Sequence, residues 1–188
     1  LAYILGDWGF RRLILKTDAR ALVPRPETEV LVDRVLALVQ DVASPRVVDV
    51  GTGSGAIALA VKSECPAATV TAVDLSPEAL ALAQENAAEL SLEVTFVEGN
   101  LLDAVTGPFD LIASNPPYVD DSEAPLLQPE VRDHEPRLAV FGHGETEALA
   151  DAARDKLASG GALVLECHEG KADAIAALLT TLGYEEVR

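Results

Sequence analysis

The chain has 188 residues, of which 49% are apolar, and this length and composition support one well-packed core and one domain. Its 31 acidic and 14 basic residues give a formal charge of -17, which disfavours direct binding to the phosphate backbone of a nucleic acid. No apolar run approaches the roughly 18 residues that span a bilayer, so we expect no membrane association and a cytoplasmic protein.

The first elements predicted along the chain form a short β-hairpin. Its β segments are expected at residues 8–15 and 21–23, on either side of a turn at Thr17-Asp18-Ala19. A helix is predicted from Pro26, because proline suits a first helical turn and because apolar residues recur behind it at helical spacing, at Leu31, Val35, Leu38, Val39 and Val42. We therefore divide the chain into a hairpin and helix at residues 1–44 and a main domain at residues 45–188.

Beyond Pro45, predicted strands and helices alternate. Strands are expected at residues 46–50, 69–74, 93–98, 109–114 and 162–167. Helices are expected at residues 56–64, 77–89, 145–158 and 171–182. This alternation is typical of an α/β fold, with a mostly parallel sheet and helices on both of its faces.

A glycine-rich turn, Gly51-Thr52-Gly53-Ser54-Gly55, directly follows the first of these strands. Glycines let the backbone pass close to a ligand, and the helix amino terminus that follows favours a carboxylate or a phosphate. Asp74 ends the next strand, where it can accept hydrogen bonds from ribose hydroxyls. With Ala56 the turn also fits the loose dinucleotide pattern, so S-adenosylmethionine, NAD and a turn that binds no ligand stay open from this segment alone.

The residues Asn115-Pro116-Pro117-Tyr118 directly follow the predicted strand at residues 109–114. The Asn115 amide oxygen and the Pro116 carbonyl oxygen can together accept both hydrogens of a planar NH2 group, on which the Tyr118 ring can stack. We predict Asn115, Pro116 and Tyr118 as catalytic residues and all four as substrate-binding residues. This arrangement predicts methyl transfer to an amide or amine nitrogen. Such a reaction needs a methyl donor, which favours S-adenosylmethionine over NAD. The alternative is a stiff strand-ending turn whose asparagine caps backbone groups.

Taken in order, these segments resemble a known family. Pro24-Arg25-Pro26-Glu27-Thr28-Glu29, the glycine-rich turn, Asp74 and the Asn-Pro-Pro-Tyr run are similar to the protein-(glutamine N5) methyltransferases of the HemK type. The resemblance implies a Rossmann-like class I S-adenosylmethionine-dependent methyltransferase fold, with S-adenosylhomocysteine as the second product. It also implies that residues 51–55 lie along the methionine and ribose, that Asn100 and Leu101 flank the adenine, and that Asn115 touches the cofactor as well.

The best-known members of this family modify peptide chain release factors, so the resemblance implies a release-factor glutamine as the substrate. The alternatives are a glutamine of a ribosomal protein, the N6 of adenine in a nucleic acid, and a non-catalytic S-adenosylmethionine-binding domain. Relatives carry an amino-terminal helical domain and a last antiparallel strand, both of which we expect to be missing here. Cys65 and Cys167 are isolated in the sequence, so we expect free thiols and no metal site.

Residues 119–144 are unusually long for a loop in a compact domain. We predict either a wall around the incoming peptide, with Glu135-Pro136 bracing the Asn115 turn, or a simple surface excursion. Arg25 and Glu27 are expected either to face the site or to form a surface ion pair. Relatives often have an aspartate where this chain has Asn100, and an amide can still bind the adenine amino group through its oxygen.

Overall fold

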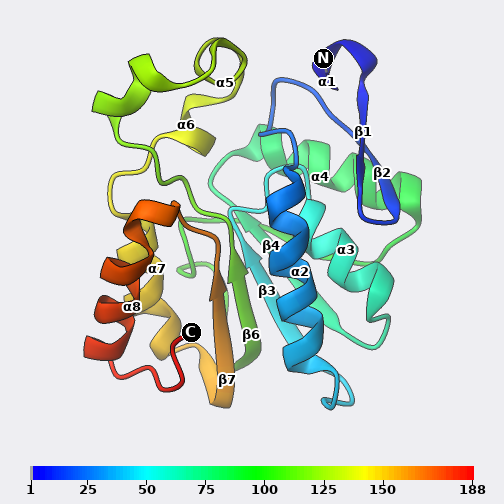
Figure 1. Cartoon of the computed structure of the whole chain (residues 1–188). Coiled ribbons are helices and arrows are strands. Elements are labelled where there is room, and N and C mark those ends of the chain that lie inside the picture. Colours follow the sequence, from blue (N-terminus) through cyan, green and yellow to red (C-terminus); the bar gives the residue numbers. More distant parts are fainter. Residues whose placement is uncertain (1) are drawn as a thin grey trace.

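The computed structural model of the chain describes residues 2–188, apart from the side chain of Glu169. It contains a five-stranded parallel sheet with the order β5-β4-β3-β6-β7 (Figure 1). The strands are β3 (Arg46–Val50), β4 (Thr69–Asp74), β5 (Thr95–Glu98), β6 (Phe109–Ser114) and β7 (Leu157–Leu165). The predicted α/β fold with a mostly parallel sheet is confirmed.

Helices cover both faces of this sheet (Figure 1). One face carries α2 (Pro26–Val39), α3 (Ala56–Glu64) and α4 (Pro77–Leu90). The other face carries α7 (Glu145–Arg154) and α8 (Ala172–Thr181), which lie side by side. Both faces of β3 and β6 are therefore largely buried, which explains why most of their residues are apolar and not only every second one.

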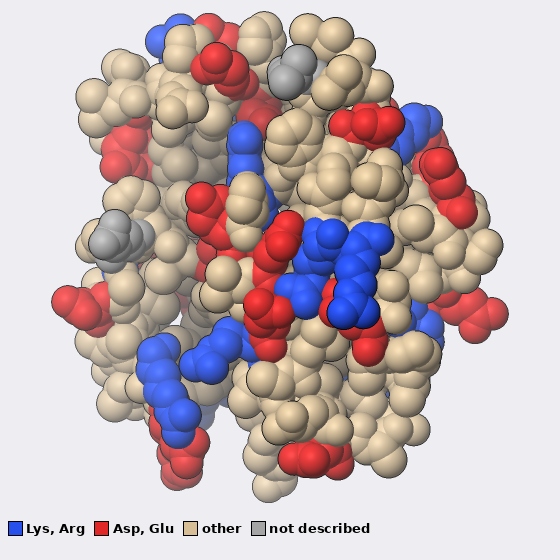
Figure 2. All heavy atoms as spheres, turned by 45° about the vertical axis from the view of Figure 1, so that its right-hand side comes forward, with Lys and Arg blue, Asp and Glu red and all other residues tan. Residues whose placement is uncertain are grey.

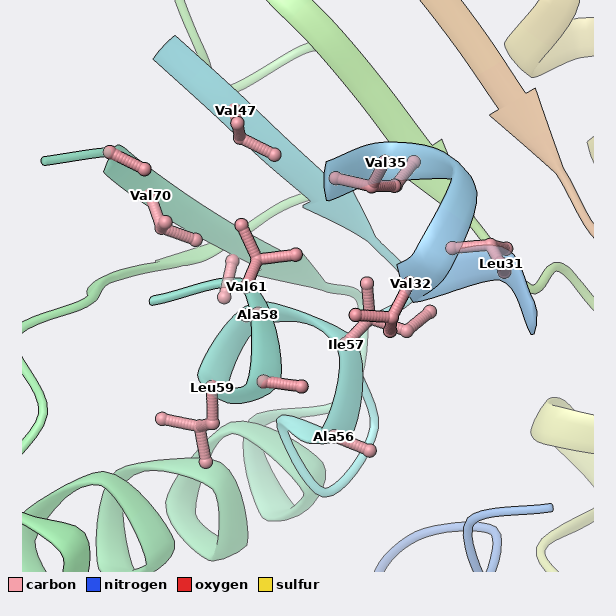
Figure 3. Close-up of a cluster of buried hydrophobic side chains, with 14 of the residues drawn as sticks. Leu31, Val32, Val35, Val47, Ala56, Ile57, Ala58, Leu59, Val61 and Val70 are labelled. Atoms are coloured by element: carbon pink, nitrogen blue, oxygen red, sulfur yellow. The ribbon is translucent and has the colours of Figure 1, made fainter. Parts of the chain in front are cut away.

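The larger part of the core lies between the sheet and the helices α2 and α3. Val32 of α2 and Ile57 of α3 meet between the two helices, and Val61 of α3 points toward Val70 of β4 (Figure 3). Burial of each such side chain stabilises the fold by about 1.5–3 kcal/mol. A second cluster on the opposite face is formed by Val48, Val50, Val73, Ile112, Leu149 and Ala153.

The connections of the sheet determine where a ligand can bind. From β3 the chain runs outward through β4 to β5, and it then returns to place β6 on the other side of β3. The helices after β3 and β6 therefore leave on opposite faces, and a crevice opens between the carboxyl ends of these two neighbouring strands. Ligands of open α/β sheets bind at such a switch point.

The amino-terminal hairpin is present, but its predicted turn is wrong. The strands are β1 (Asp7–Phe10) and β2 (Leu13–Lys16), preceded by α1 (Ala2–Leu5), and residues 21–23 are not a strand. The turn lies at Arg11-Arg12, where Arg11 has a φ of 52°. The Arg11 guanidinium pairs with Glu64 at 2.5 Å and with Asp33 at 2.7 Å, contacts that fix this turn from distant parts of the chain.

Other boundaries also differ from the prediction, such as the end of α7 at Arg154 instead of residue 158. β7 begins at Leu157, five residues earlier than the predicted start at Ala162, and a register shift between Phe109 and Leu111 accommodates the extra length. Residues 119–144 contain η1 (Asp121–Leu126), α5 (Pro129–His134) and α6 (Arg137–Val140), and η2 (Glu169–Lys171) precedes α8. Residues 182–188 form no strand. Across the described residues, no helix combines the length and the apolar character that crossing a membrane requires.

Candidate active site

A cavity of about 200 Å³ lies at the carboxyl ends of the strands, at the switch point between β3 and β6. The predicted residues that line it are Gly51, Thr52, Gly53, Ser54, Asp74, Asn100, Leu101, Asn115, Pro116 and Pro117. They come from the ends of four different strands and are brought together because parallel strands end at the same edge of the sheet. Of the predicted site residues, Gly55 and Tyr118 do not line this cavity.

The glycine-rich turn is held in a conformation that favours glycine. Gly51, Gly53 and Gly55 have φ values of 70°, 57° and 87°, a region that residues with a Cβ rarely adopt. A Cβ built on Gly51 would meet no atom of the described chain within 4 Å, so the turn is open toward the cavity. A Cβ on Gly55 would lie 3.0 Å from Leu59 Cδ1, which makes Gly55 a packing position at the start of α3.

Two aspartates hold the glycine-rich turn through hydrogen bonds. Asp74 Oδ2 accepts a hydrogen bond from Gly53 N at 2.8 Å, and burial raises the pKa of Asp74. Asp49 is fully buried, and its Oδ2 accepts hydrogen bonds from Thr52 Oγ1 at 2.6 Å and from Ala58 N at 3.1 Å. Burial raises the pKa of Asp49 to about 7, against the opposing effect of these hydrogen bonds. The glycine-rich turn, the predicted binding site for the methyl donor, is therefore held by Asp49 as well as by Asp74.

The Asn115 turn, residues 115–118, forms the opposite wall with its first three residues. Asn115 Nδ2 donates a hydrogen bond to Thr28 Oγ1 at 3.2 Å. Tyr118 lies off the cavity, with its ring centroid 6.2 Å from that of His168, and its carbonyl oxygen accepts a hydrogen bond from Lys171 Nζ at 2.7 Å. The predicted stacking of Tyr118 on a substrate therefore stays a prediction.

The segment at residues 119–144 contributes Pro136, Leu138 and Ala139 to the cavity lining. The expectation that Glu135 braces the Asn115 turn is wrong. Its carboxylate is hydrogen-bonded instead to Tyr3 Oη, to Val23 N at 3.3 Å and to Arg25 Nη2 at 2.7 Å. Glu135 thus ties this segment to the amino-terminal part of the chain, and Arg25 both forms this ion pair and lines the cavity.

The Asn115 turn has other supports, which were not predicted. Gly142 packs directly on Pro117, and Gly142 N donates to the Val119 carbonyl at 3.0 Å. Thr28 and Glu166 lie beside Asn115. Thr28 belongs to the Pro24-Arg25-Pro26-Glu27-Thr28-Glu29 motif, but the sequence alone does not indicate that it contacts Asn115. Glu166 follows β7 directly, and the rule that parallel strands end at one edge could have indicated it.

Comparison with known proteins agrees with this architecture. The methyltransferase small domain family matches residues 27–133, more than half of the chain. Among solved structures, the ribosomal protein L11 methylase from Lactobacillus delbrueckii subsp. bulgaricus has a TM-score of 0.65 over 92% of this chain and 85% of that chain, at 21% identity, which shows a shared fold. CalS10, an amino pentose methyltransferase from Micromonospora echinaspora with SAM bound, has a TM-score of 0.50 over 76% of this chain and 50% of that chain, at 26% identity.

Curated relatives are more similar in sequence. The release factor glutamine methyltransferase of Deinococcus radiodurans is 51% identical over 195 residues, which cover 100% of this chain and 69% of the relative. Proteins of the same name from Bordetella pertussis and Caulobacter vibrioides are 42% and 40% identical over 100% of this chain, and over 71% and 68% of their own lengths. The chain thus spans about two thirds of the length of these relatives. It belongs to the family of release factor glutamine methyltransferases.

Proposed function

We propose that the protein transfers a methyl group from S-adenosylmethionine to the side-chain amide nitrogen of a glutamine in a peptide chain release factor. One observation carries the proposal: the glycine-rich turn after β3 and the Asn115 turn after β6 line the same cavity. A donor site and an acceptor site for methyl transfer need this proximity, because the reacting atoms must be held within about 3–3.5 Å of each other.

The residues on the β3 side fit S-adenosylmethionine, which supplies an activated methyl group on a positively charged sulfur. The open backbone at Gly51 leaves room for a ligand against the turn. In this proposal residues 51–54 hold the methionine part, Asp74 accepts hydrogen bonds from the ribose hydroxyls, and Asn100 and Leu101 flank the adenine. Leu101 has a φ of 50°, an unusual conformation for a leucine, which turns this segment where it borders the cavity.

The residues on the β6 side fit a carboxamide. An amide nitrogen is a weak nucleophile because its lone pair is delocalised into the carbonyl group. Asn115 Oδ1 and the Pro116 carbonyl oxygen would each accept one N–H of the substrate amide and so hold its nitrogen in position. The same two oxygens would stabilise the positive charge that develops on the nitrogen, and the proton released on methylation can leave to water.

The surface charge supports a protein substrate rather than a nucleic acid. The formal charge is -17, and on the face shown in Figure 2 the basic side chains lie beside acidic ones. Pairs such as Arg20 with Glu85 and Arg11 with Glu64 leave these cations less available for phosphates. A release factor acts in translation, so the proposal includes a cytoplasmic location.

Transfer of a labelled methyl group tests the proposal. The enzyme is incubated with labelled S-adenosylmethionine and a purified release factor, a variant of that factor with the modified Gln→Ala, a ribosomal protein, or an adenine-containing oligonucleotide. We expect label on the wild-type factor alone. Label on the ribosomal protein or the oligonucleotide would replace the proposed substrate, and cofactor binding without any transfer would support a non-catalytic domain.

A further inference from the structure

The side chain of Asn115 is oriented by its neighbours rather than by the turn alone. Asn115 Nδ2 donates to Thr28 Oγ1 at 3.2 Å. Thr28 lies in the first turn of α2 and is only 4% exposed, so water competes little for its hydroxyl group. A hydroxyl group can accept from Asn115 and donate its own hydrogen to a third group.

Glu166 is placed as that third group by the pairing of β6 with β7. Ser114 pairs with Leu165 in parallel register, and Glu166 N donates to the Ser114 carbonyl at 3.0 Å. Asn115 and Glu166 are therefore the next residues on neighbouring strands. Thr28 and Asn115 lie close enough to the Glu166 carboxylate for their polar groups to lower its pKa. Its Oε2 is buried and has no hydrogen-bond partner within the described residues.

An ionised carboxylate can only accept hydrogen bonds, so neighbouring side chains are favoured when they turn their polar hydrogens, and not their oxygens, toward it. In our inference the Thr28 hydroxyl turns its hydrogen toward Glu166, so that its oxygen accepts from an N–H group, as it does from Asn115 Nδ2. The nitrogen of the Asn115 amide is therefore held on the side of Thr28 and Glu166, which leaves Oδ1 free to accept from a substrate. The reversed amide would set an oxygen against a carboxylate, which costs free energy.

We propose that Glu166 is a positioning residue that acts through Thr28 to present the Asn115 amide oxygen, and not its nitrogen, to the substrate carboxamide. This inference rests on the proposed function. It assigns a role to a residue that lies outside the cavity lining, and it gives a reason for a half-buried carboxylate beside Asn115.

The pH dependence follows from the same contacts. Burial raises the pKa of Glu166, the nearby Thr28 hydroxyl lowers it, the charge of Glu27 raises it and the Asn115 amide lowers it. Once protonated, Glu166 becomes a donor and the direction of the contacts is lost, so turnover should fall on the acid side. Tyr118 and Cys167 also face Glu166, and burial followed by the charge of Glu166 raises the pKa of both, so they stay neutral in this range.

Steady-state kinetics on the release factor provide the first test, with cofactor affinity measured by calorimetry. We expect Glu166→Gln and Thr28→Val to lower kcat by about tenfold or more, to change the KM for the release factor less, and to leave cofactor binding intact. Glu166→Gln should also lose the acid limb of the pH profile. Thr28→Ser, which keeps the hydroxyl group, should recover most of kcat relative to Thr28→Val. Glu89→Gln, the same change on the exposed face of α4, is the control.

The second test does not depend on turnover. In ¹⁵N spectra, the side-chain amide signals of Asn115, identified by their loss in Asn115→Ala, should titrate with Glu166 and stop doing so in Glu166→Gln. Unchanged kcat in Glu166→Gln, or Asn115 signals that ignore Glu166, would overturn the inference. Should Glu166→Gln fail to fold, equal kcat for Thr28→Val and Thr28→Ser would overturn it. A wild-type enzyme that does not methylate the factor refutes the proposed function, while the titration still decides the inference.

Discussion

Gly142 lies directly against the carbonyl group of Pro117. A Cβ built on Gly142 would be 2.1 Å from the Pro117 oxygen and 3.2 Å from Tyr118 Cα, so only glycine fits there without movement of the backbone. The contact joins the end of the 119–144 segment to the Asn115 turn, and an isolated bridge between Val119 and Phe141 lies beside it. The far side of the Asn115 turn is therefore shaped by a residue more than twenty positions later in the chain.

Gly142→Ala should displace the Asn115 turn. We expect the free energy of unfolding to fall by about 1–3 kcal/mol, as for other overpacked positions, and kcat for methyl transfer to fall by about tenfold or more. Cofactor affinity, measured by calorimetry, should stay near that of the wild type. Gly9→Ala is the matched control, because a Cβ there meets no described atom within 4 Å. Equal turnover in both variants would show that this contact is not needed.

Glu135→Gln should loosen the 119–144 segment. The Glu135 side chain is 5% exposed and accepts hydrogen bonds from Tyr3, Val23 and Arg25. Gln keeps one acceptor oxygen but loses the charge, so we expect the free energy of unfolding to drop by about 1–3 kcal/mol. Limited proteolysis should cut residues 119–144 faster than in the wild type. The control is Glu130→Gln, on the exposed side of α5, which should change neither the free energy of unfolding nor the proteolysis rate. A wild-type proteolysis rate in Glu135→Gln would show that Glu135 does not hold the 119–144 segment.

Asp49 should make the protein less stable as the pH rises. Its pKa is about 7 in the folded state because of burial, against about 3.9 in an unfolded chain. The folded state thus binds the proton more tightly, and this stabilisation is complete below the unfolded pKa and is lost as the pH rises through 7. Between about pH 5 and about pH 8, the stability of the wild type relative to Asp49→Asn should fall by on the order of 2 kcal/mol. Chemical denaturation at several pH values measures this difference, and a constant difference would contradict the assignment.

Asp74→Ala should weaken cofactor binding without unfolding the protein. Asp74 Oδ2 holds Gly53 N at 2.8 Å and Oδ1 holds Ser76 N at 2.9 Å, so its loss frees the glycine-rich turn as well as removing the expected ribose contact. Loss of a hydrogen-bonded charge costs about 1.5–3 kcal/mol, which corresponds to a Kd for S-adenosylmethionine that is about tenfold to a hundredfold higher. Glu93→Ala, an exposed position, is the control, and equal affinities for the two variants would exclude Asp74 from the site.

The inner strands and the helix α3 could be predicted to the residue. β3, β4, β6 and α3 are compact apolar segments bounded by glycine, proline or a polar residue, so local sequence contains the information that places them. The hairpin turn could not be predicted, because Arg11 is held at a positive φ by Glu64 and Asp33, which lie far away in sequence.

In the candidate site, too, some features could be predicted from the sequence and others could not. The glycine-rich turn, Asp74 and Asn115 follow strands directly, and the topology of the sheet brings them into one cavity. The contacts that Glu166, Gly142 and Glu135 make across the site depend on strand register and on how the 119–144 segment folds back. Local patterns carry no information about these, so Glu135 was assigned to the wrong partner.

Replacement of Asn115 tests the central claim most directly. Asn115→Ala removes one of the two oxygens that orient the substrate amide, and it leaves the glycine-rich turn and Asp74 in place. Mass spectrometry of the release factor measures glutamine methylation, and calorimetry on the same preparation measures the Kd for S-adenosylmethionine. We predict that methylation falls by at least about a hundredfold, while the Kd, which loses at most one hydrogen bond to the cofactor, rises by no more than about tenfold. Methylation by Asn115→Ala at the wild-type rate would contradict the account.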